Sequence, residues 1–154
     1  MIINKIIIIV GLPGSGKSCL INEKYFDKKK YLVIDDMNGG AVFDCSNFCY
    51  SKHYPNLIIG MMQGKKDIVI SDISFCDINN FNEAKNILEW WINNNDINYK
   101  ITSIFFKNDP DQCKKNIKDQ NISRLEKINE FTKIYNPFSM KSDGDEIVSV
   151  YKEK

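Results

Sequence analysis

A glycine-rich turn that follows an apolar run constrains this chain more than any other feature. The run IIIIV, residues 6–10, stops at Gly11, and the turn ends in Gly16, Lys17 and Ser18. This spacing fits the pattern G-x-x-x-x-G-K-[ST], in which glycines let successive backbone N–H groups point at phosphate oxygens. A helix that begins there adds its positive end. The pattern therefore predicts a strand, a phosphate-binding loop and a helix, in that order.

The loop assigns a group of residues to the phosphates of a nucleotide and to its metal ion. We expect Lys17 to reach the β- and γ-phosphates and the Ser18 hydroxyl to coordinate Mg²⁺. The predicted cofactors are therefore ATP and Mg²⁺. Because no N-K-x-D sequence follows a late strand, guanine selection of the GTPase kind is not expected. The expected nucleotide-binding residues are Gly11, Pro13, Gly14, Ser15, Gly16, Lys17, Ser18 and Cys19.

Strand and helix patterns alternate along the rest of the chain. Apolar runs predict strands over residues 2–10, 31–35, 67–72, 100–106 and 146–150. Helices are expected over about residues 16–27, 55–64, 79–95 and 122–135, with another opening at Asp109 and Pro110. In the last helix, Ile122, Leu125, Ile128 and Phe131 or Thr132 are expected to face inward. This alternation predicts a three-layer α/β/α arrangement with a parallel sheet.

Length, charge and cysteine content bound the class of protein. A chain of 154 residues suits one domain, expected to span residues 1–154. A formal net charge of +1 lacks the basic excess of proteins that bind long nucleic acid. The first apolar run is too short to cross a membrane. Five cysteines without a C-x-x-C pattern predict free thiols and a cytoplasmic location, in the host cytoplasm if the protein is viral.

Two predicted strands end in carboxylates. Asp35 ends the second strand and is followed by Asp36, and Asp72 ends the third. In open α/β sheets, ligands bind beyond the carboxyl ends of the strands. We expect Asp72 to hold the hydration shell of Mg²⁺ opposite Ser18, and Asp35 to accept the proton of a hydroxyl group, with Asp36 as the alternative. A capping or turn role is the other interpretation of each carboxylate.

Four stretches, in order, resemble the kinase domain of phage-type polynucleotide 5′-hydroxyl kinases and their relatives among small P-loop kinases. They are GLPGSGKS, the acidic pair in VIDDM, IVISDISFCDINNFNEAKNILEW and SIFFKNDPDQCKKNIKDQN. The resemblance covers roughly residues 1–136. It implies a P-loop NTPase fold with a five-stranded parallel sheet in the strand order 2-3-1-4-5, a Mg-ATP donor and transfer to a hydroxyl. It also matches Asp35 with the general base and Asp72 with the third-strand acid, and puts a lid at about residues 108–124.

The chain departs from this resemblance at several places. Cys19 stands where a hydroxyl residue is usual, and Met37 and Asn38 stand where an arginine commonly grips the acceptor. The lid usually offers arginines, whose planar fork lysine does not replace at a bidentate site. Here Lys118 and Arg124 are the cations expected to supply charge at the γ-phosphate.

The sequence therefore favours an ATP-dependent phosphotransferase that moves the γ-phosphate to an acceptor hydroxyl. Its expected catalytic residues are Lys17, Asp35, Lys118 and Arg124, and a polynucleotide 5′ end is one candidate acceptor. The alternatives are a nucleoside or nucleotide kinase, and a nucleotide-binding module that does little chemistry and acts through a partner. Acceptor contacts are expected within residues 36–55.

Overall fold

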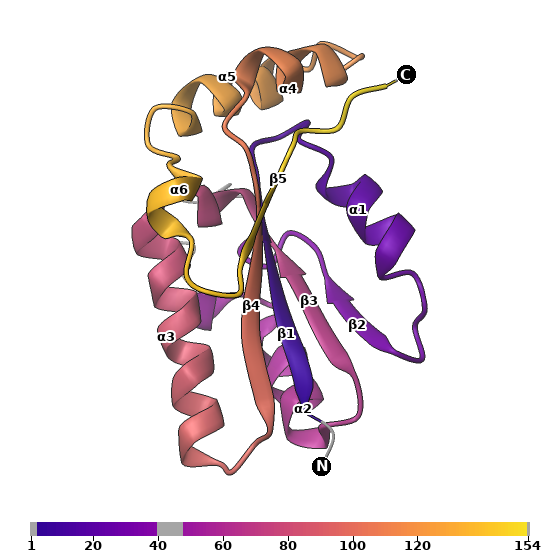
Figure 1. Cartoon of the computed structure of the whole chain (residues 1–154), viewed down its shortest axis with the longest axis vertical. Helices are drawn as coiled ribbons and strands as arrows, with labels where there is room; N and C mark the ends of the chain where they lie inside the picture. Colours follow the sequence, from indigo (N-terminus) through magenta and orange to yellow (C-terminus); the bar gives the residue numbers. More distant parts are fainter. Residues whose placement is uncertain (1–2, 40–47, 154) are drawn as a thin grey trace.

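The computed structural model describes residues 3–39 and 48–153, which form a parallel sheet flanked by helices (Figure 1). The strands are β1 (Asn4–Val10), β2 (Tyr31–Ile34), β3 (Asp67–Ser71), β4 (Tyr99–Phe106) and β5 (Glu146–Val148). Their spatial order is β2-β3-β1-β4-β5, which confirms the predicted order with the loop strand in the centre. The register is parallel, so that Ile8 lies opposite Ile70 on one side and Ser103 on the other.

Helices cover both faces of this sheet. They are α1 (Lys17–Lys24), α2 (Tyr54–Gln63), α3 (Ile78–Asn94), α4 (Pro110–Asn116), α5 (Ile122–Phe131) and α6 (Pro137–Met140), with 3-10 turns η1 (Phe48–Tyr50) and η2 (Ile73–Cys76). Right-handed crossovers put α1 on one face and α2 and α3 on the other, and Figure 1 shows α1 and α3 on opposite sides. In the described part of the chain, no helix has the length and apolar character needed to cross a membrane.

The core is built around the central strand. β1 is buried along residues 6–10, and a continuous apolar run is what a strand covered on both faces requires. α3 buries Phe81, Ala84 and Leu88 against the sheet, as their helical spacing predicts. α4 and α5 lie beyond the carboxyl ends of the strands, beside the last residues of the chain (Figure 1).

The helix after the lid differs from the prediction. α5 ends at Phe131 rather than near residue 135. Ile128 and Phe131 are buried as expected, but Ile122 is 72% exposed. The expectation for Ile122 was wrong because α5 packs on the rest of the protein through its second half, which leaves its first turn in solvent. α6, η1 and η2 were not predicted, since each is too short to show a helical period.

A tryptophan–tyrosine contact ties two helices on one face together. Trp91 Nε1 of α3 donates a hydrogen bond to the Tyr54 hydroxyl of α2 at 2.7 Å. The Tyr54 ring also packs edge-on against Phe48, with ring centroids 5.8 Å apart. Buried Trp and Tyr side chains stabilise a structure most when their polar atoms find such partners. α2 and α3 are therefore held as a pair.

Asn108, just after β4, fixes the segment that follows α5. Its Nδ2 donates to the carbonyl oxygens of Thr132 at 2.9 Å and Tyr135 at 3.0 Å, and its Oδ1 accepts from Thr132 Oγ1 at 2.6 Å. The Tyr135 hydroxyl in turn donates to the carbonyl oxygen of Phe106 at the end of β4. These contacts stop α5 where it ends and anchor it to the sheet.

We expect Asn108→Ala to lower the free energy of unfolding by about 1–3 kcal/mol, because it leaves part-buried backbone carbonyls without donors. Chemical denaturation measures the change. The matched control is Asn82→Ala on the exposed face of α3, expected to change stability by about 0.5 kcal/mol or less. Equal stability of the two variants would show that the Asn108 contacts do not anchor α5.

Candidate active site

The loop between β1 and α1 keeps the turn that its sequence predicts. Gly14 has φ of 79° and Gly16 has φ of 109°, a left-handed region that favours glycine. A Cβ atom on Gly14 would lie 2.5 Å from the carbonyl oxygen of Cys113, and one on Gly16 would lie 2.6 Å from Cβ of Tyr151. The loop therefore packs directly against the lid and the C-terminal segment. Glycine is required at both positions because of the backbone conformation and because of the lack of space.

Lys17 folds back over this loop. Its Nζ donates to the carbonyl oxygens of Gly11 at 2.6 Å and Leu12 at 3.0 Å. Loss of water around the ammonium group lowers the pKa of Lys17, and the nearby Asp35 and Asp72 carboxylates oppose that shift. The side chain is thus held at the loop, next to the space that the phosphates of a nucleotide would fill.

Two buried thiols lie near this lysine and stay protonated. Burial raises the pKa of Cys76 to about 12 and the pKa of Cys113 to about 12, although the Lys17 charge opposes both shifts. A thiol of this kind is a weak nucleophile, because the thiolate is the reactive form. Cys19, Cys49, Cys76 and Cys113 are free thiols as predicted, and Cys45 lies outside the described residues.

A cavity of about 700 Å³ opens above the loop and brings most of the predicted site residues together. Gly16, Lys17, Ser18 and Cys19 line one side of it, and Asp35 and Asp36 line another. Lys118 and Arg124, the two lid cations singled out from the sequence, also line the cavity, as do Lys127 and Glu153. A site of this size accommodates a nucleotide.

Asp35 is fixed at the end of β2. Its Oδ1 accepts hydrogen bonds from Ser71 Oγ and from the backbone N–H of Asp36, the latter at 3.0 Å. Its other oxygen, Oδ2, takes no hydrogen bond from a described residue. Asp36 has φ of 52°, and desolvation followed by the Asp35 and Asp72 charges raises its pKa. Gly39 has φ of 79° and lines the cavity, whereas residues 40–47 lie outside the described residues.

Asp72 is placed differently from Asp35. Its side chain is fully buried and accepts hydrogen bonds from the backbone N–H groups of Asn38 at 2.9 Å and Ser74 at 2.8 Å. It therefore caps η2, and it is absent from the lining of the cavity. Ser18 lines the cavity, so of the two predicted magnesium ligands only Ser18 faces the space where phosphates would lie.

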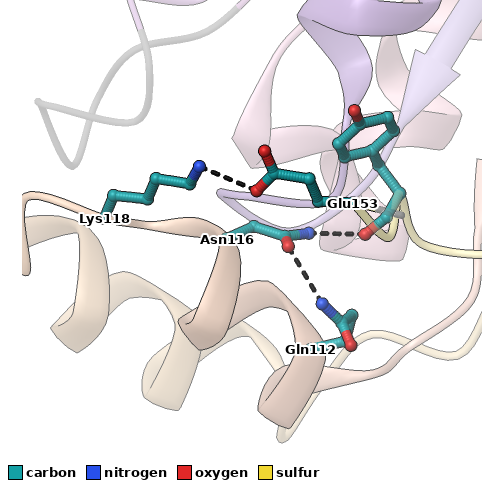
Figure 2. Close-up of polar contacts among 5 residues, drawn as sticks. Gln112, Asn116, Lys118 and Glu153 are labelled. Carbon is teal, nitrogen blue, oxygen red and sulfur yellow. Dashed lines mark hydrogen bonds and ion pairs between the residues drawn. The ribbon is translucent and has the colours of Figure 1, made fainter.

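The lid helix and the C-terminal segment meet at one asparagine, which Figure 2 shows between its partners. Asn116 Nδ2 donates to the carbonyl oxygens of Gly14 at 2.9 Å and Tyr151 at 2.7 Å. Gln112 Nε2 donates to Asn116 Oδ1 at 2.9 Å, which orients the amide. One side chain thus joins the loop, α4 and the end of the chain.

Two further contacts join the C-terminal segment to the site. The Tyr151 N–H donates to the carbonyl oxygen of Ser15 at 2.9 Å. Lys118 Nζ lies 2.7 Å from a carboxylate oxygen of Glu153, also drawn in Figure 2. Both side chains of this ion pair are largely exposed, so water screens it. Lys118 is therefore paired with a carboxylate in the structure, at the mouth of the cavity.

Sequence reasoning missed Asn116, Tyr151, Glu153 and Lys127. Their contacts join segments far apart in the chain, for example the 102 positions between Gly14 and Asn116. No local pattern marks such contacts. The resemblance of the lid to that of other P-loop kinases points to cations, here Lys118 and Arg124. It gives no reason to select a neutral amide beside them.

The sheet order β2-β3-β1-β4-β5 and the glycine-rich loop after β1 together define a P-loop NTPase fold. A gluconokinase from Sinorhizobium meliloti 1021 superposes with a TM-score of 0.53 at 14% identity, covering 99% of this chain and 86% of that one. A structure from the PezAT chromosomal toxin–antitoxin system of Streptococcus pneumoniae matches with a TM-score of 0.49 at 12% identity, covering 95% and 68%. The finer resemblance to polynucleotide 5′-hydroxyl kinases stays a prediction.

The comparison of sequences points to a viral relative. The uncharacterized protein R277 of Acanthamoeba polyphaga mimivirus is 28% identical over 151 residues, which cover 96% of this chain and 98% of that protein. No protein-family model matches the chain. The similarity therefore extends along nearly the whole of both chains.

We expect Asn116→Ala to loosen the C-terminal segment from the loop. Losing about 1.4 kcal/mol of hydrogen bonding raises the population of the locally open state about tenfold. Exchange of the Tyr151 N–H with solvent should therefore accelerate by about that factor. Hydrogen exchange followed by NMR measures it. Lys118→Ala is the control and should accelerate this exchange less, since it removes only an exposed ion pair. An unchanged exchange rate in Asn116→Ala would contradict the assignment.

Proposed function

We propose that the protein is an ATP-dependent phosphotransferase that moves the γ-phosphate of Mg-ATP to an acceptor hydroxyl. The observation that carries the proposal is a single cavity lined by Lys17 of the loop, by the carboxylate of Asp35 and by the lid cations Lys118 and Arg124. Phosphoryl transfer needs positioning and charge stabilisation above all, and this cavity offers both. The gluconokinase among the structures of similar fold supports a kinase activity.

In the proposed reaction, each residue acts at one place. The loop and Lys17 hold the phosphates, and Asp35 accepts the hydroxyl proton through its second oxygen. Lys118 and Arg124 meet the charge on the transferring group. Mg²⁺, when bound, would neutralise charge on the phosphates. Ser18 would hold it directly, and Asp72 would act only through its hydration shell, because Mg²⁺ keeps several waters in such sites.

The acceptor is the open part of this proposal. A polynucleotide 5′-hydroxyl follows from the resemblance to phage-type kinases, and a nucleoside or nucleotide hydroxyl is the alternative. Residues 36–55 are the predicted acceptor side, and they hold no arginine. The assay for transfer therefore needs a panel: 5′-hydroxyl oligonucleotides, nucleosides and small sugars, each with labelled ATP.

A second candidate function is a nucleotide-binding module with little chemistry. The ion pair between Lys118 and Glu153 favours it, because a paired lysine offers less charge to a phosphoryl group. Cys19, where a hydroxyl residue is usual, points the same way. Binding of ATP without transfer to any member of the panel would support the module and contradict the kinase.

Lys17→Ala should lower turnover about a hundredfold or more, since removal of one preorganised charge from such a site typically costs that much. Labelled phosphate transferred per minute is the measurement, and circular dichroism checks the fold. The control is Lys24→Ala, an exposed lysine at the end of the same helix, expected to keep full activity. Turnover in Lys17→Ala equal to that of the unaltered protein would sink the mechanism.

Asp35→Asn should lower the transfer rate while leaving ATP affinity within about twofold, because the amide cannot accept the proton but fills the same space. Transfer rate and nucleotide titration measure the two quantities. Asp36→Asn tests the neighbouring carboxylate, which was the alternative base. A loss confined to Asp36→Asn would move the role of base to that residue.

A further inference from the structure

A second cavity, of about 400 Å³, lies between β2 and α2. We propose that this cavity, named here the edge groove, is the acceptor site, and that it takes an uncharged hydroxyl compound such as a nucleoside or a sugar rather than a phosphorylated one. Residues 32–35 line one wall, and His53, Asn56 and Gln63 line the other. The inference rests on the phosphotransfer proposed above and deepens it by naming the class of acceptor.

Asp35 joins the edge groove to the nucleotide cavity. Asp35 is part of the lining of both. Because Oδ1 already accepts from Ser71 and Asp36, Oδ2 is the oxygen available to a hydroxyl group. A compound in the groove that presents a hydroxyl to Asp35 thus presents it at the boundary of the phosphate site.

The transfer requires only the acceptor, ATP and the Asp35 carboxylate. The acceptor oxygen forms a bond to the γ-phosphorus while the bond from that phosphorus to the bridging oxygen of the β-phosphate breaks. ADP leaves with the electron pair of the broken bond. The hydroxyl proton passes to Asp35. No further reactant is needed.

The groove follows the open edge of the sheet. Consecutive strand residues point to opposite faces, so a cavity lined by residues 32, 33 and 34 runs along the strand edge rather than over one face. Three residue steps of β-strand span about 10 Å, which is about the length of a nucleoside. β2 is the terminal strand, so backbone N–H and C=O groups on its outer side are open to a ligand.

One face of α2 forms the opposite wall. His53, Asn56, Gly60 and Gln63 are three to four residues apart and therefore lie on the same side of the helix. A Cβ atom on Gly60 would lie 2.6 Å from Cδ2 of Leu32. Glycine at this position lets the helix approach β2 and sets the depth of the groove. The amides of Asn56 and Gln63 each offer donors and an acceptor, which suits hydroxyl groups and base edges.

The charges of the two cavities are unlike, and this decides the class of acceptor. The nucleotide cavity is lined by four cations, Lys17, Lys118, Arg124 and Lys127, and by three carboxylates, Asp35, Asp36 and Glu153. No lysine or arginine is among the described residues that line the edge groove. Over residues 31–63 the sequence has one such cation, Lys52, which is exposed and outside the lining. Arg and Lys supply the full positive charge with which proteins bind phosphates, and a phosphorylated acceptor has neither as a counter-charge among the described lining residues.

The N-terminus of α2 offers an anion little counter-charge, because among its first three residues only the Asn56 N–H has no hydrogen-bond acceptor in the described part of the chain. The Tyr54 N–H donates to the carbonyl oxygen of Ser51 at 3.1 Å, and Pro55 has no N–H group. The His53 N–H donates to Ser51 Oγ at 3.0 Å. The Asp35 carboxylate at the same end of the groove repels an anion. Neutral hydroxyl compounds meet neither penalty.

A matched pair of acceptors tests whether the groove prefers an uncharged compound to a phosphorylated one. Adenosine and 3′-AMP carry the same 5′-hydroxyl and differ by one phosphate. We expect kcat/KM for adenosine to exceed that for 3′-AMP at least about tenfold, and the same order for the other ribonucleosides and for glucose over gluconate. Preference for the anionic member of these pairs, or for a 5′-hydroxyl oligonucleotide, would overturn the inference.

His53 provides a readout that does not depend on turnover. It is the only histidine of the chain, so every imidazole signal in NMR spectra of the protein comes from this residue. Because His53 lines the groove, these signals report on the groove. Titration with adenosine, uridine and glucose is expected to shift these signals, and 3′-AMP is expected to shift them only at concentrations about tenfold higher. Absence of any shift with all three neutral compounds would overturn the groove as their site.

Variants of the groove separate this proposal from the phosphotransfer itself. Asn56→Ala should raise KM for the neutral acceptor about tenfold and KM for Mg-ATP less than twofold, because the amide contacts only the acceptor. Asn56→Lys should narrow the preference for adenosine over 3′-AMP, since it adds a cation. Asn82→Ala on α3 is the control, expected to change neither constant.

The outcomes distinguish the two claims. Shifts of the His53 signals without transfer to any acceptor would leave the groove as a binding site and reject the phosphotransferase. Transfer that is indifferent to Asn56→Ala and produces no His53 shift would keep the phosphotransferase and reject the groove. Three results together support both the phosphotransferase and the groove: transfer that prefers neutral acceptors, a shift of the His53 signals and a raised acceptor KM in Asn56→Ala.

Discussion

The turn of the glycine-rich loop is the constraint on which the rest of the site depends. Gly14 and Gly16 hold left-handed conformations, and the space beside each is taken by backbone or side-chain atoms of the lid and of the C-terminal segment. The loop is therefore also a packed junction between the lid and the C-terminal segment. A change in either segment reaches the loop through direct contacts, because close-packed interiors transmit small displacements.

Much of the fold could be predicted because its signals are local. The continuous burial of β1 and the helical spacing of Phe81, Ala84 and Leu88 follow from residues adjacent in the sequence. The strand order came from a resemblance of four short stretches, and the structure has that order. Ile122 shows the limit, since an apolar residue in helical register is buried only if something packs on its side.

The site was predictable to the extent that strand ends determine positions. Asp35 follows directly from the rule that ligands bind at the carboxyl edge of a parallel sheet, and it lines the cavity. Asp72 obeys the same rule, yet its oxygens are taken up by two backbone N–H groups. The sequence cannot distinguish these outcomes, because the difference lies in how the chain turns after each strand. Asn116 was missed for another reason, because its contacts join segments far apart in the chain.

The hydrogen bond between Trp91 and Tyr54 has a consequence for selection by size. Because α2 is fastened to the 17-residue helix α3, it cannot swing outward from β2 without moving a much larger body. The width of the space beside β2 is thereby set before any compound enters. Because α2 is already held in position, it loses little conformational entropy when a compound binds beside it. Compounds are therefore selected by how well they fit the existing space.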